Sequence, residues 1–394
     1  MKGKAGIALL LAAAGAAFAV AASTAATDAS RGPHAAAAPD RTLIACNRSR
    51  ALSIGLAAPI TGPAASLGAQ QRSWARFFIT RWNAAHKKGF KMRLVEGDTQ
   101  LPNVAEAIRV ANNFRSQSAV LGVAGPAGSQ EVQDSTSAYR AGGLAFVSGS
   151  ATRTSLTDGS RRNYFFRVVP TDADQGASVA NYMNNTLKYR RVHIIDDQEA
   201  YSQGLADEVE RRLKAAGVNV TRDSVSQQAT SFAGQIAKIG NDVRSVYIPW
   251  QLSSQAQAFG QQLRQAGRSA VLFGSDGLFD PDNFKIAGSY VSFFPVARTS
   301  PIITAYRRAH NSKPDFFGAP TYEAVHVLAQ AIQAGCRNGS VTRAEVRAQL
   351  RRINFPAKSV VLSVPIKFSA NGDIQRRRFG IFRIATNGAY NPIG

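Results

Sequence analysis

Short apolar runs alternate with longer segments of helical period from residue 51 onward. In one such segment, Trp74, Phe78 and Trp82 recur at a spacing of four and therefore share one face of a predicted helix. Strands are predicted over 51–57, 92–96, 119–123 and 144–147, and helices over 69–85, 102–116 and 129–140. Alternation of strands and helices with short connections predicts a parallel sheet that is covered by helices on both faces.

The alternation begins again after Val168-Val169-Pro170. Helices are predicted over 174–187, 202–216, 232–241 and 255–266, and strands over 191–195, 218–225, 243–248 and 270–273. The chain is therefore predicted to be an α/β protein with two lobes of the same architecture. Its 394 residues agree with roughly two to three domains.

The C-terminal segments are expected to return to both lobes, which requires several crossings between them. Helices are predicted over 301–310, 322–333 and 343–352. Two apolar segments, 360–368 and 379–384, flank the turn-forming sequence Asn371-Gly372-Asp373. This arrangement predicts an antiparallel hairpin.

The N-terminus has the features of an export signal. Lys2 and Lys4 precede an apolar run over 5–22, and small residues follow over 23–26. We therefore expect a cleaved signal peptide over 1–26 and a leader over 27–50. No other stretch approaches the ~20 apolar residues that a membrane helix needs.

The chain contains two cysteines, Cys46 and Cys336. A disulfide between them is the favoured interpretation, because an exported protein can retain one. Free thiols are an alternative. Leu43-Ile44-Ala45-Cys46 also fits the letters of a bacterial lipoprotein box. However, Asp40 and Arg41 precede it and the segment 23–42 separates it from the apolar run, which disfavours a lipid anchor.

The formal net charge is +22, and the arginine pairs that contribute to it are scattered along the chain. Nucleic-acid grooves more often combine clustered basic residues with interleaved aromatic residues, so no nucleic-acid partner is expected. The excess charge favours non-specific contact with anionic surfaces such as cell-envelope polymers or lipid headgroups.

The segment Leu272-Phe273-Gly274-Ser275-Asp276-Gly277-Leu278 places one carboxylate directly after a predicted buried strand. Ligands of open α/β sheets bind at such strand ends, although aspartate is also a common turn residue. None of the five histidines lies at metal-ligand spacing from another, and no nucleophile elbow or phosphate-binding loop is present. We therefore predict a pocket that binds a molecule, with no catalytic residues, no metal and no cofactor.

Several segments together resemble the leucine/isoleucine/valine-binding proteins, which are type I periplasmic solute receptors of ABC importers. The resemblance covers roughly residues 50–390 and rests on the order of these segments: 55–63, 122–130, 148–152, 167–176, 197–206 and 274–277. It implies two Rossmann-like lobes that are joined by three hinge crossings, near Pro170-Thr171, Phe294-Pro295-Val296 and Leu362-Ser363-Val364. We expect lobe 1 to comprise 51–170 and 297–362, and lobe 2 to comprise 171–296 and 363–394.

The resemblance also implies a set of ligand-binding residues. Ser150 and Thr152 match positions that hold a ligand carboxylate, and Asp276 matches the acid that binds its ammonium group. Tyr201 matches an aromatic residue that contacts the ligand. Either Trp250 or Gln251 lies where the family has a second aromatic residue in the cleft, and Trp250 is the one expected to bind ligand. A Gly125-Pro126-Ala127-Gly128-Ser129 loop replaces a serine-rich loop, and its proline has no N–H to donate. We therefore expect Ser129, or alternatively the backbone of Ala127, to contribute in its place. Leu67 stands where an aromatic residue is common.

By this resemblance, the chain is expected to be an exported receptor, periplasmic or associated with the cell surface, that binds a small amino-acid-like ligand and delivers it to an ABC permease. Amides, urea or aromatic acids are alternative ligands on the same scaffold. A ligand sensor or interaction protein is an alternative role. An enzyme that uses Asp276 as a base is a more remote one.

Overall fold

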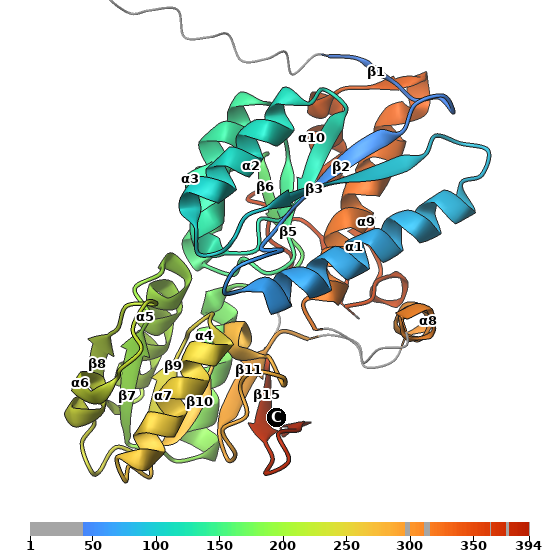
Figure 1. Ribbon diagram of the computed structural model, residues 1–394. Coiled ribbons are helices and arrows are strands. Elements are labelled where there is room, and N and C mark those ends of the chain that lie inside the picture. Colours follow the sequence, from blue (N-terminus) through green and yellow to red (C-terminus); the bar gives the residue numbers. More distant parts are fainter. Residues whose placement is uncertain (1–41, 296–299, 311–315, 363, 376–377, 394) are drawn as a thin grey trace, which may run out of the picture. The chain divides into compact units, whose positions relative to one another are not determined.

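The computed structural model describes residues 42–295, 300–310, 316–362, 364–375 and 378–393 (Figure 1). The predicted signal peptide and the first part of the predicted leader, 1–41, lie outside the described residues. Val296 and Ser363, which belong to two of the predicted hinges, lie outside them as well. The described residues all belong to one structural unit.

The first sheet consists of five strands in the order β3-β2-β4-β5-β6, and every neighbouring pair is parallel. Their bounds are β2 Leu52–Ala58, β3 Met92–Asp98, β4 Val120–Ala124, β5 Phe146–Ser148 and β6 Phe165–Arg167. All seven residues of β2 are buried, because this strand lies inside the sheet and is covered on both faces. The predicted parallel sheet is thus present, with β6 as an additional strand.

Helices cover both faces of this sheet (Figure 1). On one face, α1 (Ala65–Ala85) and α9 (Gly318–Gly335) pack against the strands through a core that includes Trp74 and Leu328. On the other face, α2 (Val104–Ser116) and α3 (Ser129–Ala141) contribute Phe114 and Tyr139 to a second core. Helix α9 comes from the C-terminal third of the chain, so this segment does return to the first half.

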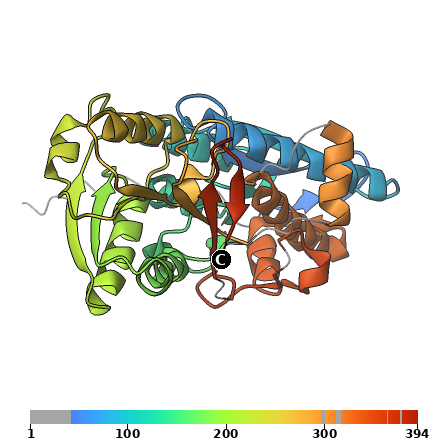
Figure 2. The same cartoon turned by 90° about the horizontal axis from the view of Figure 1, so that it is seen from below.

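The second sheet consists of seven strands in the order β16-β15-β11-β10-β9-β7-β8. The bounds are β7 Arg191–Asp196, β8 Asn219–Ser224, β9 Ser245–Ile248, β10 Val271–Gly274, β11 Tyr290–Phe293, β15 Gly380–Ile384 and β16 Tyr390–Pro392. Strands β7 to β11 are parallel, whereas β15 and β16 are antiparallel to their neighbours. Figure 2 shows these two C-terminal strands side by side. The sheet is therefore mixed, where a parallel one was predicted.

Four helices flank the second sheet: α4 (Asp172–Asn181), α5 (Ala200–Ala215), α6 (Ala233–Lys238) and α7 (Ser253–Gln265). Helices α4 and α5 share one core with Tyr247 and Phe273. Helices α6 and α7 share another with Trp250. A five-residue π-helical turn over Tyr182–Thr186 extends α4, which agrees with the predicted helix over 174–187.

The predicted hairpin between 360–368 and 379–384 is wrong. Strand β14 (Ile366–Lys367) pairs with β13 (Asn354–Phe355), whereas β15 pairs with β11 and β16. The turn at 371–373 does form, and Gly372 adopts a φ of 96° there. This turn is attached to the end of β6, because the Asp373 carboxylate binds the Arg167 guanidinium at 2.6 Å.

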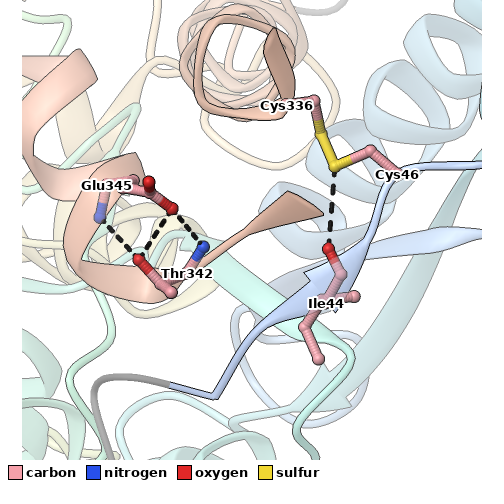
Figure 3. The surroundings of a disulfide bond; sticks show 5 residues. All are labelled: Ile44, Cys46, Cys336, Thr342 and Glu345. Carbon is pink, nitrogen blue, oxygen red and sulfur yellow. Dashed lines mark hydrogen bonds between the residues drawn. A yellow bond between two sulfur atoms is a disulfide. The ribbon is translucent and has the colours of Figure 1, made fainter. Parts of the chain in front are cut away.

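The segment before the first sheet is tied to the end of α9. Strand β1 (Ile44–Ala45) pairs with β12 (Ser340–Val341), and Cys46 forms a disulfide with Cys336, whose Cα atom lies 5.7 Å away (Figure 3). Close by, Thr342 and Glu345 form the capping box of α10 (Arg343–Leu350). Among the residues that the structure describes, no helix has the length and apolar character needed to span a membrane.

Candidate functional site

A small cavity of about 20 Å³, enough for roughly one water molecule, lies where loops from the two sheets meet. From the first half of the chain, its wall includes Leu67, Ser129 and Ser150. From the second half, it includes Tyr201 and Asp276, together with Gln251, Gly277 and Phe317. Four of the six predicted ligand-binding residues therefore line one cavity, although they lie far apart in the sequence.

Asp276 is held in place by the end of strand β10. It begins a short 3-10 turn, Asp276–Leu278, and its side chain is buried. The next residue must be glycine-sized, because a Cβ atom at Gly277 would lie 2.4 Å from the Trp250 carbonyl oxygen. The Tyr201 hydroxyl donates a hydrogen bond of 2.6 Å to the Asp276 carboxylate. The loop therefore presents this carboxylate to the cavity in one orientation.

A second buried acid lies near Asp276. Asp172 is the first residue of α4, is fully buried, and has a pKa raised to about 8, first by burial and then by repulsion from Asp276. Burial raises the pKa of Asp276 to about 6, and the hydrogen bond from Tyr201 opposes this rise. Within the described ranges, no lysine, arginine or histidine forms an ion pair with either acid. A cation placed beside Asp276 would therefore relieve an unbalanced negative charge.

The serines on the other side of the cavity join two loops. The Ser150 hydroxyl donates to the Ala127 carbonyl oxygen at 2.8 Å, and the Ser129 hydroxyl accepts from the Arg153 backbone N–H at 3.2 Å. Helix α3 begins at Ser129, so its first-turn N–H groups lie at this end of the cavity. Burial raises the pKa of Glu131 in that first turn to about 7, which reduces the negative charge that would oppose an anion there.

Thr152 and Trp250 do not line the cavity. Thr152 is fully buried, and its carbonyl oxygen accepts from the Asp172 N–H at 2.8 Å. Its hydroxyl lies close enough to Asp172 to oppose the rise in that pKa, but it forms no hydrogen bond of standard geometry. Trp250 is a core residue: its ring packs against Phe232, and its indole N–H donates to the Ile195 carbonyl oxygen at 2.7 Å. The neighbouring Gln251, which the sequence left as the alternative, lies on the cavity wall.

A larger cavity of about 200 Å³ adjoins the first. The two share five wall residues: Ala64, Leu67, Gln251, Gly277 and Phe317. Beyond them, the wall of the larger cavity is mainly polar and includes Ser66, Gln70, Ser253, Ser254, Asp280 and Asn283. The Ser66 hydroxyl donates to the Asp280 carboxylate at 3.1 Å, which links α1 to the loop after β10.

Sequence reasoning missed several of these residues. Arg153 donates to the Ala200 carbonyl oxygen at the start of α5 and so connects the loop after β5 with the second half of the chain. Asp172 and Asp280 were also missed. The sequence indicates only weakly that Asp280 belongs to the site, because it lies only four residues after Asp276. Asp172 could not be identified in this way, because it resembles an ordinary acid at a helix N-terminus.

The groups at this site are suited to binding a molecule. They provide a buried carboxylate, a tyrosine that orients it, two serine hydroxyls and a helix N-terminus. Among the described residues, no three histidines, cysteines or acids gather as metal ligands would. The Asp276 carboxylate is complementary in charge to an ammonium group, and the start of α3 is complementary to an anionic group.

Comparison with known proteins gives a consistent result. A sequence model of the family described as periplasmic binding protein matches residues 51–389. The chain is 27% identical over 350 residues to the Leu/Ile/Val-binding protein of Citrobacter freundii, covering 86% of this chain and 92% of that protein.

Solved structures share the fold. A leucine-binding protein of Thermotoga maritima superposes with a TM-score of 0.77 at 22% identity, covering 87% of this chain and 98% of that one. A solute-binding protein of an ABC transporter from R. palustris, in complex with benzoate, gives a TM-score of 0.75 at 16% identity, covering 88% and 96%. The fold predicted from the sequence, that of the type I periplasmic binding proteins, is therefore confirmed.

Proposed function

Since the chain belongs to the family of periplasmic binding proteins, we propose that it is the extracytoplasmic receptor of an ABC importer and binds an amino acid in the cavity beside Asp276. Proteins of this family are receptors of transporters, and the chain is not an enzyme. The relatives that bind leucine, isoleucine and valine support an amino acid as the class of ligand.

The observation that carries the proposal is the buried carboxylate of Asp276, which has a hydrogen bond from Tyr201 but no cationic partner among the described residues. An α-ammonium group supplies the missing charge through a charge-assisted hydrogen bond. The ligand carboxylate then lies near Ser129 and Ser150, at the N-terminus of α3, where backbone N–H groups favour an anion. We propose an indirect role for Thr152, through its contact with Asp172.

We propose that ligand binding closes two lobes about three hinges. Lobe 1 would comprise 51–170 and 297–362, and lobe 2 would comprise 171–296 and 363–394. Because wall residues come from both halves of the chain, a ligand contacts both at once and stabilises the closed arrangement. The link between Arg153 and the start of α5 supports closure on the side of α3.

We further propose that the signal peptide exports the chain and that an ABC permease is its partner at the membrane. The periplasmic relatives support export. The net charge of +22 supports an additional, non-specific contact with the anionic cell envelope.

The test is isothermal titration calorimetry of the purified protein with the twenty common L-amino acids, acetamide, urea and benzoate. We expect at least one amino acid to bind with micromolar or lower Kd, and its N-acetyl derivative, which lacks the ammonium group, to bind far more weakly. Binding of benzoate, but of no amino acid, would favour an aromatic acid as the ligand. That outcome would refute the role of Asp276, because a buried carboxylate disfavours an anion that carries no ammonium group.

A further inference from the structure

We infer that the ligand is an amino acid with a long aliphatic side chain that ends in a positively charged group, as in lysine, ornithine or arginine, and that Asp280 receives this end. The inference rests on the proposed function, since it extends a ligand already anchored at Asp276. The inference specifies the class of the ligand's side chain, which neither membership of the family nor the contact with Asp276 determines.

The first step is the continuity of the two cavities. A ligand whose ammonium group contacts Asp276 could extend its side chain into the larger cavity past the five residues that both cavities share. Leu67 and Phe317 make this junction largely apolar. Methylene groups pack well there, because they bury apolar surface against a leucine and an aromatic ring. The larger cavity of about 200 Å³ then has room for the end of a long side chain.

The second step is the polarity beyond the junction. The Gln251 amide oxygen is buried and has no hydrogen-bond partner among the described residues, although Gln251 lines both cavities. A buried acceptor without a donor costs about 1–3 kcal/mol. An apolar side chain such as that of leucine would leave this oxygen unpaired, whereas the N–H groups of an ammonium or guanidinium can satisfy it.

The third step is the charge of Asp280, whose surface is only 9% exposed. Its carboxylate accepts hydrogen bonds from the Ser66 hydroxyl at 3.1 Å and the Asn283 amide at 2.8 Å, and from the backbone N–H groups of Asp282 and Asn283 at 3.2 Å each. All four donors are neutral groups. In the part of the chain that the structure describes, no lysine, arginine or histidine pairs with Asp280. A ligand cation would supply the missing charge.

The experiment compares L-lysine with L-norleucine, which has the same four-carbon stem without the terminal ammonium, by calorimetry at pH 7.5 and low salt. L-Leucine, L-ornithine and L-arginine complete the panel. We expect lysine, ornithine or arginine to bind at least tenfold more tightly than norleucine and leucine.

Two variants assign the effect to a side chain. Asp280→Asn keeps an oxygen for the hydrogen bonds within the loop but removes the charge, so it should weaken binding of the cationic amino acid at least tenfold and that of norleucine less than threefold. Ser66→Ala is the matched control: it removes a bond to Asp280 but keeps the charge, and it should change the affinities of both ligands by similar factors.

Tighter binding of leucine or norleucine than of every cationic amino acid would overturn this inference and leave the proposed function intact. Equal losses of lysine and norleucine affinity in Asp280→Asn would likewise overturn it, because Asp280 would then only support the loop. If no amino acid bound at all, the proposed function itself would fail.

Discussion

Replacing Asp276 with asparagine should make the protein more stable and a poorer receptor. Burial raises the pKa of this carboxyl from 3.8 to about 6. Because the folded-state pKa lies above the unfolded-state value, the ionised acid opposes folding, and this penalty develops as the pH rises from about 4 to 6. A difference of this size corresponds to about 3 kcal/mol at neutral pH. Asparagine removes the charge and retains an acceptor for the Tyr201 hydroxyl.

We therefore expect the free energy of unfolding of Asp276→Asn, without amino acid, to exceed that of the unmodified protein by about 1–3 kcal/mol at pH 7.5. The gain should largely disappear at pH 4, where the carboxyl is protonated in both states. The repulsion that raises the pKa of Asp172 also disappears in this variant, which adds to the gain. Urea unfolding at the two pH values measures the difference.

The same substitution should weaken amino-acid binding by about 2–4 kcal/mol, because the ligand ammonium loses its charged partner. Asp282→Asn is the matched control, since Asp282 is an exposed acid in the same loop and forms no ion pair among the described residues. It should change neither quantity by more than about 0.5 kcal/mol. A less stable Asp276→Asn variant, or one with unchanged affinity, would refute the reasoning.

Three further predictions concern the pH, the core and the disulfide. Amino-acid affinity should fall about tenfold per unit as the pH decreases below about 6, because ligand binding requires ionised Asp276; calorimetry across pH 4.5–8 measures this. Trp250→Phe should lower the free energy of unfolding by about 1–3 kcal/mol with little loss of affinity. Gln251→Ala should instead weaken amino-acid binding and change the free energy of unfolding little. Replacing both Cys46 and Cys336 with serine should lower the free energy of unfolding by about 2–4 kcal/mol. If the unfolding curve of this double variant matched that of the unmodified protein, the prediction for the disulfide would be wrong.

Much of the fold could be predicted from the sequence, because hydrophobic period and strand–helix alternation are local properties. Helix α3 and strand β7 begin where the pattern predicts them. Pairing between distant segments was harder to predict. The apolar runs over 360–368 and 379–384 both have the composition of strands, but each pairs with a partner elsewhere in the chain. Composition describes a strand, whereas its partner depends on the tertiary fold.

The candidate site shows the same division between local and tertiary information. Asp276 could be found because it follows a predicted buried strand. Adjacent residues at a strand end point to opposite sides, so only one of Trp250 and Gln251 can face the cavity. The sequence alone does not show which of the two does. Trp250 faces the core, whereas Gln251 faces the cavity. The role of Asp172 depends on its proximity to Asp276, which arises only when α4 packs against the second sheet beside strand β11.

The uncompensated acids connect the architecture to the proposed receptor function. The wall around Asp276 includes residues from both halves of the chain, so bringing the halves together removes this carboxylate from water. The part of this desolvation that occurs on closure opposes closure at neutral pH, unless a cation accompanies it. A ligand ammonium cancels this cost only when the halves are together. The ligand therefore binds one arrangement better than the other, which is the thermodynamic requirement for coupling binding to closure. An uncharged residue at position 276 would weaken this coupling together with the affinity, because the same carboxylate provides both.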